Sequence, residues 1–509
     1  MDPHVSRLRR FAGLCLLALG LGATSAAGEA TPRREIVISI LFNQRQVPGL
    51  EAVARAYEKL HPDRQVRVEM KGGGHGVGYP TWLSTQLATG DPRPDIVSSN
   101  YAPNYDGYVD LDTYRWVRNP YSGRIWNDDF DFDYFQALNV AGKRITLGTQ
   151  SVKVMWYYNR TKFEALGLRK PRTWAELIQL FDRIRQAGYQ AHTLKFNYKH
   201  HQWLARIFWD QFIRPFAQTI RAQPGDWCFR PDADGDWAYH PDNPTNDAGI
   251  TINYARLFRA VRDGEMRWDG PEFKAVLRAL KDVADRGSSD FMVSTSTDNE
   301  DGYGRFLRQE ALIHLETSGL VASLERDIPQ LAKTGQSFQW DVFDTPPLDD
   351  PHVKAPVRGI ESMVGEYIGV IYKDQAQTDA VMDFLMFWLS PTGYQRFVDT
   401  VIAADCFQHE GELLVRDVKL PPQYQGLSRW MKRVGNAENQ WNLPFQLPPE
   451  GSRLRNDAML ALTRYLQGEL DVDATAAQIQ AIMITSVPEV LKRTGLQPSD
   501  LDHPERDPR

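Results

Sequence analysis

The sequence predicts an α/β protein built from two lobes. Segments typical of buried strands alternate with segments typical of amphipathic helices, a pattern that favours mostly parallel sheets flanked by helices on both faces. The chain has 509 residues, and a single hydrophobic core stops growing at roughly 250–300 residues. We therefore expect two cores, each with its own sheet and its own helices.

The first residues have the composition of a secretory signal peptide. Three arginines precede an apolar run from Phe11 to Leu21, and small residues follow up to Ala27. The apolar run is shorter than the ~20 residues that a membrane-spanning helix needs. We expect residues 1–27 to be removed and the mature protein to be exported to the periplasm.

Charge and cysteine content restrict the partners. The formal net charge of −6 becomes about −8 without residues 1–27, which contain three arginines and one aspartate. A nucleic-acid partner is therefore not expected. Cys228 and Cys406 remain in the mature chain. In an oxidising compartment they form either a disulfide or two separate thiols, since the sequence does not fix the distance between them.

The strands and helices of the first lobe follow from local patterns. Ile36 to Leu41 and Asp95 to Val97 are apolar runs of strand length, and Val66 to Met70 alternates as a strand does. Leu50 to Leu60 has apolar residues at helical spacing. The glycine-rich loop Gly72 to Gly78 matches neither common phosphate-binding motif, so we expect no nucleotide site.

Polar and aromatic residues stand where these strands end. In open α/β sheets, ligands bind beyond the carboxyl ends of the strands. Each residue type is also common in ordinary turns, so the prediction rests on their coincidence. The candidate ligand-binding residues in this lobe are Asn43, Gln44, Trp82, Asn100 and Tyr101.

The stretch from Lys153 to Leu177 carries the clearest local pattern. Val154 to Tyr158 is β-branched and aromatic, which is typical of a buried strand. Thr161 to Glu164 and Thr173 to Glu176 each have the Thr-x-x-Glu spacing of a capping box. We therefore expect two helices after this strand, the second ending near Gly188.

The order of these pieces resembles a known family. Tyr-Tyr-Asn, Phe-Glu-x-x-Gly-Leu and Pro-x-Thr-Trp-x-Glu-Leu, read from Tyr157 to Leu177, are similar to the bacterial extracellular solute-binding proteins of family 1. These are periplasmic sugar-binding components of ABC transporters and include the maltodextrin-binding proteins. The resemblance runs from about Ile36 to Met483 and implies a type II periplasmic-binding-protein fold.

The resemblance also implies how the chain divides. Residues 30–151 with 360–404 are expected in lobe 1, and residues 152–359 with 405–509 in lobe 2. The chain is expected to cross between the lobes near Val152–Tyr158, Gly359–Gly369 and Val401–Phe407.

The family pattern implies ligand contacts in the second half as well. Phe306 to Ser318 resembles the Phe-x-x-Gly-x-Ala-Met segment before a ligand-contacting turn, although Gln309 replaces Gly and Ile313 stands near the Met position. The carboxylate at 316 is expected to accept hydrogen bonds from ligand hydroxyls. The candidate residues of this half are Trp203, Glu316, Thr317, Ser318 and Glu361.

Asp226 to Asn246 lacks periodicity and is rich in turn-forming residues, which predicts a surface loop. Asp232, Asp234 and Asp236 are spaced as in a calcium loop, but Asn243 stands where that loop needs a bidentate Glu. A solvated acidic loop is the better interpretation.

The implied function is capture of a sugar, polyol or related hydroxylated solute by hinge closure, followed by delivery to an ABC permease or to a sensor. We expect a monomer that is not an enzyme and uses no cofactor or metal. One alternative is a ferric-ion carrier that uses Tyr157 and Tyr158, although neighbouring strand residues face opposite sides. Another is an exported carbohydrate-active enzyme with paired carboxylates, which cannot be recognised without geometry.

Overall fold

The computed structural model describes most of the chain that follows the predicted signal peptide. Residues 1–27, the candidates Asn43 and Gln44, and residues 72–77 lie outside the described residues. Within the described part, no helix is long and apolar enough to cross a bilayer. The described residues are 33–41, 46–69, 78–103, 105–132, 134, 143–196, 198–247, 249–289, 291–292, 300–364, 367–425, 430, 433–439, 441–448 and 452–508.

Four strands form the first sheet, and they are β1 (Arg34–Ser39), β2 (Arg64–Val68), β3 (Ile96–Ser98) and β9 (Ile368–Val370). Their order is β2-β1-β3-β9. β1 runs parallel to both β2 and β3, whereas β9 joins β3 antiparallel. Two separate apolar clusters include residues of this sheet: Ile36 and Ile38 belong to one, and Val97 belongs to the other. The first sheet is therefore covered on both faces.

Five strands form the second sheet, and they are β4 (Gln150–Asn159), β5 (Gln190–His192), β6 (Ala311–Thr317), β7 (Trp340–Phe343) and β8 (Glu361–Val364). β5 and β6 are parallel, but β6, β7 and β8 all pair antiparallel with β4. The expectation of α/β sheets flanked by helices is confirmed. This sheet is nevertheless mixed and not mostly parallel, because three strands run opposite to the central one.

All ten residues of β4 are buried, as the apolar pattern predicts. Val154, Trp156 and Tyr158 pack into the larger core of the second lobe, whereas Met155 and Tyr157 pack into a smaller cluster on the opposite face. β4 is thus buried on both sides, which explains its continuous run of large apolar side chains.

The first half of β4 also belongs to a ribbon between the lobes. Gln150 to Lys153 pairs with β8, and on its other side Ser151 N donates to Glu412 O at 2.8 Å. Phe407, Leu414 and Val415 still pack into the core of the first lobe. The chain therefore stays with lobe 1 beyond the third crossing that was expected near residues 401–407.

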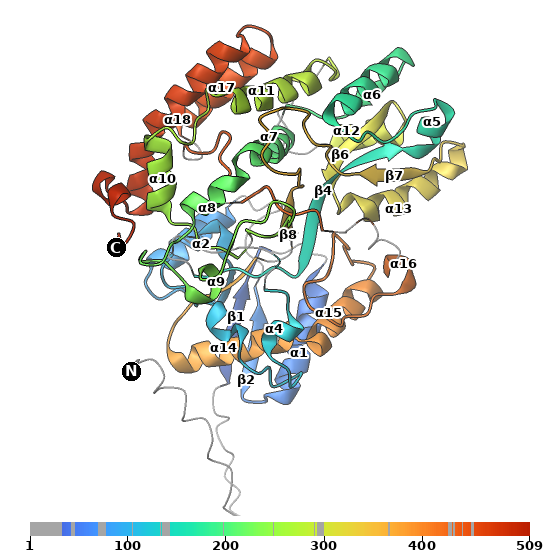
Figure 1. Cartoon of the computed structure of the whole chain (residues 1–509). Helices are drawn as coiled ribbons and strands as arrows, with labels where there is room; N and C mark the ends of the chain where they lie inside the picture. The colour runs from blue at the N-terminus through green and yellow to red at the C-terminus, as the bar shows by residue number, and fades with distance from the viewer. Residues whose placement is uncertain are drawn as a thin grey trace, which may run out of the picture.

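Helices surround each sheet, and we call each sheet with its helices a lobe (Figure 1). The helices of lobe 1 are α1 (Val47–Leu60), α2 (Tyr79–Ala88), α3 (Asp112–Arg115), α4 (Trp126–Asp129), α14 (Gln375–Trp388) and α15 (Pro391–Ala403). Those of lobe 2 are α5 (Arg160–Ala165), α6 (Trp174–Gln186), α7 (Tyr198–Ile213), α8 (Ala217–Ile220), α9 (Pro231–Asp234), α10 (Tyr254–Arg262), α11 (Pro271–Ala284), α12 (Glu300–Leu307), α13 (Leu320–Leu331), α17 (Arg453–Leu466) and α18 (Val472–Thr494). The short helix α16 (Pro422–Gln425) carries a tyrosine that packs against cores of both lobes.

The two helices after β4 begin at side-chain caps. The hydroxyl of Thr173 accepts a hydrogen bond from Glu176 N at 3.3 Å and starts α6, as predicted. The predicted capping box at Thr161 is wrong, because Asn159 caps α5 first by accepting from Lys162 N at 2.9 Å. Asn is among the strongest N-cap residues, and here it directly follows the strand.

Cys228 and Cys406 are free thiols. Cys228 is buried in lobe 2, and burial raises the pKa of its thiol to about 12. Cys406 packs at the edge of the lobe 1 core. The alternative of two separate thiols is therefore the one that holds.

The acidic segment after α8 is not simply a solvated loop. Asp234 is fully buried, and its carboxylate accepts hydrogen bonds from Arg230 N at 3.0 Å and Thr251 N at 2.8 Å. Asp226 is also buried and forms a bidentate pair with Arg256, at 2.7 and 2.9 Å. These aspartates organise the insertion, because a buried carboxylate must be paired or hydrogen bonded.

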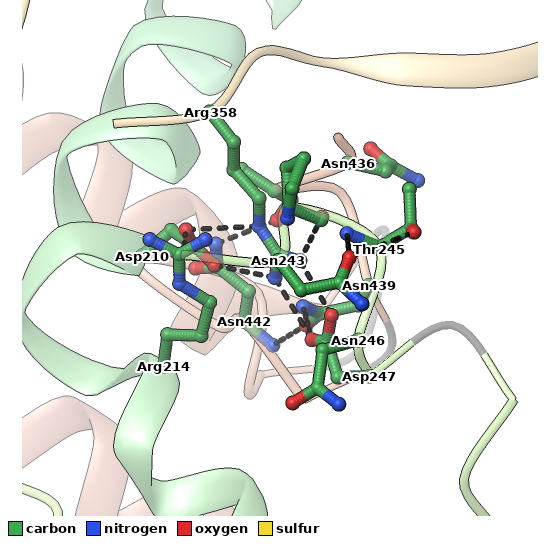
Figure 2. Close-up of polar contacts among 12 residues, drawn as sticks. Asp210, Arg214, Asn243, Thr245, Asn246, Asp247, Arg358, Asn436, Asn439 and Asn442 are labelled. Atoms are coloured by element: carbon green, nitrogen blue, oxygen red, sulfur yellow. Dashed lines mark hydrogen bonds and ion pairs between the residues drawn. The ribbon is translucent and has the colours of Figure 1, made fainter. Parts of the chain in front are cut away.

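A buried arginine fastens the end of this insertion to the rest of lobe 2 (Figure 2). The Arg358 guanidinium donates to Asp210 at 3.0 and 2.7 Å and to Asp247 at 2.9 Å. It also donates to Pro244 O at 3.1 Å. Burial disfavours the charged form, yet the two carboxylates raise the pKa of Arg358 above its ordinary value. Arg214 Nε also lies 3.6 Å from Asp210 Oδ2, so the cluster holds two carboxylates and two guanidinium groups in the interior.

Removing Arg358 is expected to destabilise lobe 2 strongly. In Arg358→Met, two buried carboxylates lose their shared partner, and breaking such a cluster costs about 3–5 kcal/mol. The midpoint of thermal unfolding, measured by calorimetry, should fall by several degrees. Arg326→Met is the control, because that arginine forms an exposed pair worth ~1 kcal/mol or less. Equal midpoints for the two variants would contradict the assigned role of Arg358.

Candidate functional site

Two of the predicted residues of lobe 1, Trp82 and Tyr101, lie next to one buried tyrosine. Tyr79 starts α2, and its hydroxyl accepts from Ser98 N at 2.9 Å at the end of β3. Its ring lies 5.4 Å from the ring of Trp82 and 5.5 Å from that of Tyr101. Asn100 and Tyr101 are exposed, and Trp82 is half-buried. The structure thus brings Trp82 and Tyr101 to the same buried ring, and Asn100 directly precedes Tyr101 in the chain.

The three candidates at the end of β6 have different environments. Glu316 and Thr317 are half-buried, and the Glu316 carboxylate accepts from Thr317 N at 2.7 Å. Ser318 is fully buried. Its hydroxyl accepts from Lys153 N at 3.1 Å and donates to Glu410 O. This serine therefore joins β6 to the ribbon between the lobes.

Glu361 is also occupied within the protein. The side chain is 4% exposed, and its carboxylate accepts from Val434 N. Asn436 accepts from Glu361 N at 3.1 Å. Burial raises the pKa of this carboxyl, and hydrogen bonding to Val434 N and the charge of Lys153 lower it. Glu361 thus fastens residues 433–439 beside β8.

Trp203 lies on the first turns of α7, with its ring 5.8 Å from that of His200. The side chain is 9% exposed and belongs to the lobe 2 core. One turn further along, Arg206 Nη1 lies 3.7 Å from Glu438 Oε1. α7 therefore places an aromatic ring and an ion pair in neighbouring positions.

Tyr367 is a residue that the sequence did not indicate as a site residue. It has a φ of 49°, which is strained for a residue other than glycine. Burial raises the pKa of its phenol, and the hydrogen bond with the Ser362 side chain lowers it. The carboxylates of Glu438 and Glu410 and the nearby Tyr101 phenol raise it further. Tyr367 therefore lies close to groups from both lobes.

Glu410 is the second such residue. Its side chain lies over the start of α13, where a Cβ added to Gly319 would meet the carboxyl carbon at 3.5 Å and Thr317 Oγ1 at 3.6 Å. Burial raises the pKa of this carboxyl. Among the described residues, no side chain or amide donates a hydrogen bond to it. A half-buried acceptor without a partner gains from any ligand that brings a donor.

These groups can hold a hydroxylated molecule without any metal. Aromatic faces pack against C–H surfaces, and carboxylates accept hydrogen bonds from hydroxyls. No cluster of three potential metal ligands occurs in the part of the chain that the structure describes. The hydroxyls of the ferric-carrier candidates diverge, because Tyr157 donates to Thr317 O at 2.8 Å and Tyr158 donates to Asp341 at 3.4 Å. One ion cannot meet both phenols in this arrangement.

Several solved structures share the fold of this chain. One is a family 1 extracellular solute-binding protein from Bifidobacterium longum subsp. infantis, with a TM-score of 0.57 and 16% identity. That match covers 89% of this chain and 100% of the other. Another is the cyclic α-maltosyl-1,6-maltose binding protein of Arthrobacter globiformis, with a TM-score of 0.55, 15% identity and coverage of 90% and 100%. The two-lobed α/β fold is thus the type II periplasmic-binding-protein fold.

Sequence comparison agrees with the fold. The chain is 25% identical over 181 residues to a multiple sugar-binding protein of Streptococcus mutans, covering 34% of this chain and 40% of the relative's length. The sequence profile of the bacterial extracellular solute-binding proteins matches residues 43–395. That match spans well over half of the sequence, so the chain belongs to the family of bacterial extracellular solute-binding proteins.

Proposed function

We propose that the protein captures a sugar or a related hydroxylated solute in the periplasm and delivers it to an ABC importer. The observation that carries this proposal is the position of Tyr367, whose backbone carbonyl accepts from Ser99 N at 3.0 Å, two residues before Tyr101, and whose phenol pKa is raised by the charges of Glu410 and Glu438. An aromatic surface beside acceptors for hydroxyls is the chemistry that sugar recognition needs. The similarity to a multiple sugar-binding protein supports the same ligand class.

Binding is proposed to act through the separation of the lobes. Tyr101 of lobe 1 and Glu438 of lobe 2 can contact the same ligand molecule only when the two lobes are close together. Ligand binding then shifts the equilibrium toward the closed form by its differential affinity for the two forms. The closed form is the state that a membrane permease distinguishes from empty protein.

The proposed binding site combines the candidates from the sequence with those from the structure. Tyr101, Tyr367 and Glu410 are proposed as direct contacts, and Ser318 and Glu361 as residues that hold them in place. The full proposed set is Asn43, Gln44, Trp82, Asn100, Tyr101, Trp203, Arg206, Glu316, Thr317, Ser318, Glu361, Tyr367, Glu410 and Glu438.

The remaining parts of the proposal concern processing and assembly. Residues 1–27 are proposed to be a removed signal peptide, and the mature protein is proposed to act as a monomer that releases its ligand unchanged. The proposed lobe boundaries are 30–151 with 360–404 and 152–359 with 405–509. The packing of Phe407, Leu414 and Val415 favours moving residues 405–420 to lobe 1.

Screening the mature protein against a carbohydrate library tests the proposed function. A specific ligand at 100 times its dissociation constant stabilises the folded protein by about 2.7 kcal/mol. We expect one class of sugar or polyol to raise the unfolding midpoint and to reduce the radius of gyration in small-angle scattering. Liberation of cleaved products from the library would instead indicate an enzyme, and no shift with any hydroxylated compound would reject the proposal.

Replacement of Glu410 separates a role in binding from a role in folding. The raised pKa of Glu410 means that its carboxyl loses its proton less readily in the folded protein than in the unfolded chain. The free energy of unfolding therefore falls as the pH rises through the folded-state pKa, and this loss of stability is present at pH 7. Glu410→Gln should therefore match or exceed the wild-type unfolding midpoint. Its sugar affinity should nevertheless fall at least tenfold, since a hydrogen bond to a charged group contributes ~1.5–3 kcal/mol.

The same variant tests the pH dependence. Wild-type affinity should fall as the pH drops through the raised pKa of Glu410, because protonation removes the charged acceptor. Glu410→Gln should lose this dependence. Glu164→Gln, at an exposed carboxylate of α5, serves as the matched control. If Glu410→Gln bound the sugar with the same affinity as the wild type at every pH, Glu410 would be excluded as a ligand contact.

A further inference from the structure

The insertion between α8 and α10 is a loop closed at its base. Arg221 pairs with Ile252, and Ala222 N donates to Thr251 O at 2.8 Å. Inside the loop, α9 is held by the buried Asp234, whose backbone carbonyl accepts from Arg221 Nη1 at 3.0 Å. Residues 222–251 therefore form a compact unit on lobe 2, and we call this unit the clasp.

The far end of the clasp is fixed as firmly as its base. Asp247 and Pro244 O accept from the buried Arg358 (Figure 2). Asn439 Nδ2 also donates to Asp247 at 3.4 Å. Asn439 directly follows Glu438 in the chain. The clasp is thus anchored beside the segment that carries a proposed ligand contact. It cannot swing away from lobe 2 without breaking a buried ion cluster.

One side chain of the clasp reaches the other lobe. Arg230 Nη1 lies 3.4 Å from Asp112 Oδ2, while Arg230 Nε donates to Thr251 Oγ1 at 3.0 Å. Asp112 starts α3 of lobe 1, where its other oxygen accepts from Arg144 Nε at 2.7 Å. Figure 1 shows α9 at the boundary between the two lobes. The Arg230–Asp112 pair therefore spans the lobes away from the ribbon that connects them.

We propose that the clasp stabilises the lobe separation seen in this structure, which we call the closed arrangement, with Arg230 and Asp112 as positioning residues that set ligand affinity without touching the ligand. The inference rests on the proposed function, because it assigns a role in lobe closure. Each partner is fixed to its own lobe, so the ion pair forms only at this lobe separation. The ion pair stabilises the closed form and not the open form. Only an interaction that differs between the two forms shifts the equilibrium between them.

The test measures the separation of the lobes without any ligand. Spin labels at Glu51→Cys on α1 and Gln179→Cys on α6 report the distance between the lobes, in a Cys406→Ser background. Arg230→Met keeps the aliphatic stem but removes the charge. We expect the ratio of open to closed populations to rise about two- to fivefold, the range for a partly exposed ion pair. Arg230→Lys should restore part of the closed population, and high salt should reduce the difference.

Two controls make the result specific. Arg262→Met removes an ion pair within lobe 2, with Asp502 at 2.8 Å, and should leave the distance distribution unchanged. Asp112→Asn keeps an acceptor for Arg144, and its effect should not add to that of Arg230→Met. The proposed role of the clasp would be contradicted if wild type and Arg230→Met had identical distance distributions. It would also be contradicted if the effects of Arg230→Met and Asp112→Asn were additive.

The ligand arm uses the carbohydrate with the largest shift in the library screen. Loss of a contact made only after closure should raise its dissociation rate two- to fivefold in Arg230→Met and leave its association rate nearly unchanged. An equal change in both rates would also contradict the clasp. If no carbohydrate binds the wild type, the proposed function is wrong. The distances measured without ligand would still show whether the clasp stabilises the closed arrangement.

Discussion

The ribbon formed by the first half of β4, β8 and residues 411–414 is the constraint on which the rest of the structure depends. Its three segments are hydrogen bonded side by side, and two of them carry the chain from one lobe to the other. Lys153 exchanges hydrogen bonds with Ser318, whose hydroxyl also donates to Glu410 O. The end of β6 and the backbone of residue 410 are therefore fixed relative to both lobes. Any relative motion of the lobes has to bend around this ribbon, because breaking it would leave buried backbone groups without partners.

The carboxylates near this ribbon are of two kinds. Glu361 is nearly inaccessible, and a backbone amide and neighbouring cations offset part of the rise in its pKa that burial causes. Glu410 lacks such compensation among the described residues, and burial raises its pKa. A protein gains no stability from an unpaired, partly desolvated carboxylate. Such a group is more often found where a ligand supplies the missing donors, which is why Glu410 carries more weight in the proposed site than its sequence context suggests.

The insertion after α8 illustrates how a polar loop acquires a defined structure. Backbone amides hold its buried Asp234, whereas Asp226 and Asp247 pair with arginines outside the insertion. The arginine that pairs with Asp247 is Arg358, 111 residues further along the chain. Burial of these charges favours one arrangement, since any displacement leaves an uncompensated ion in the interior. The result is a rigid platform from which Arg230 reaches lobe 1, and a rigid platform is what allows a single exposed ion pair to influence the spacing of two lobes.

The sequence by itself determined β4 and α6. Both elements are specified by apolar side chains and a cap within a few neighbouring positions, and such patterns act locally. It also determined the two-lobed α/β class, through chain length and the alternation of strands and helices.

Tertiary structure decided the antiparallel pairing around β4, since the direction of a returning strand depends on the path of the intervening chain. It also decided which polar groups are used up inside the protein: Ser318 and Glu361 read as ligand contacts but are bonded to backbone. Tyr367 and Glu410 have ordinary local sequences, and only the folding of segments that are far apart in the chain brings Tyr367 next to Ser99 and within the electrostatic influence of Glu410 and Glu438.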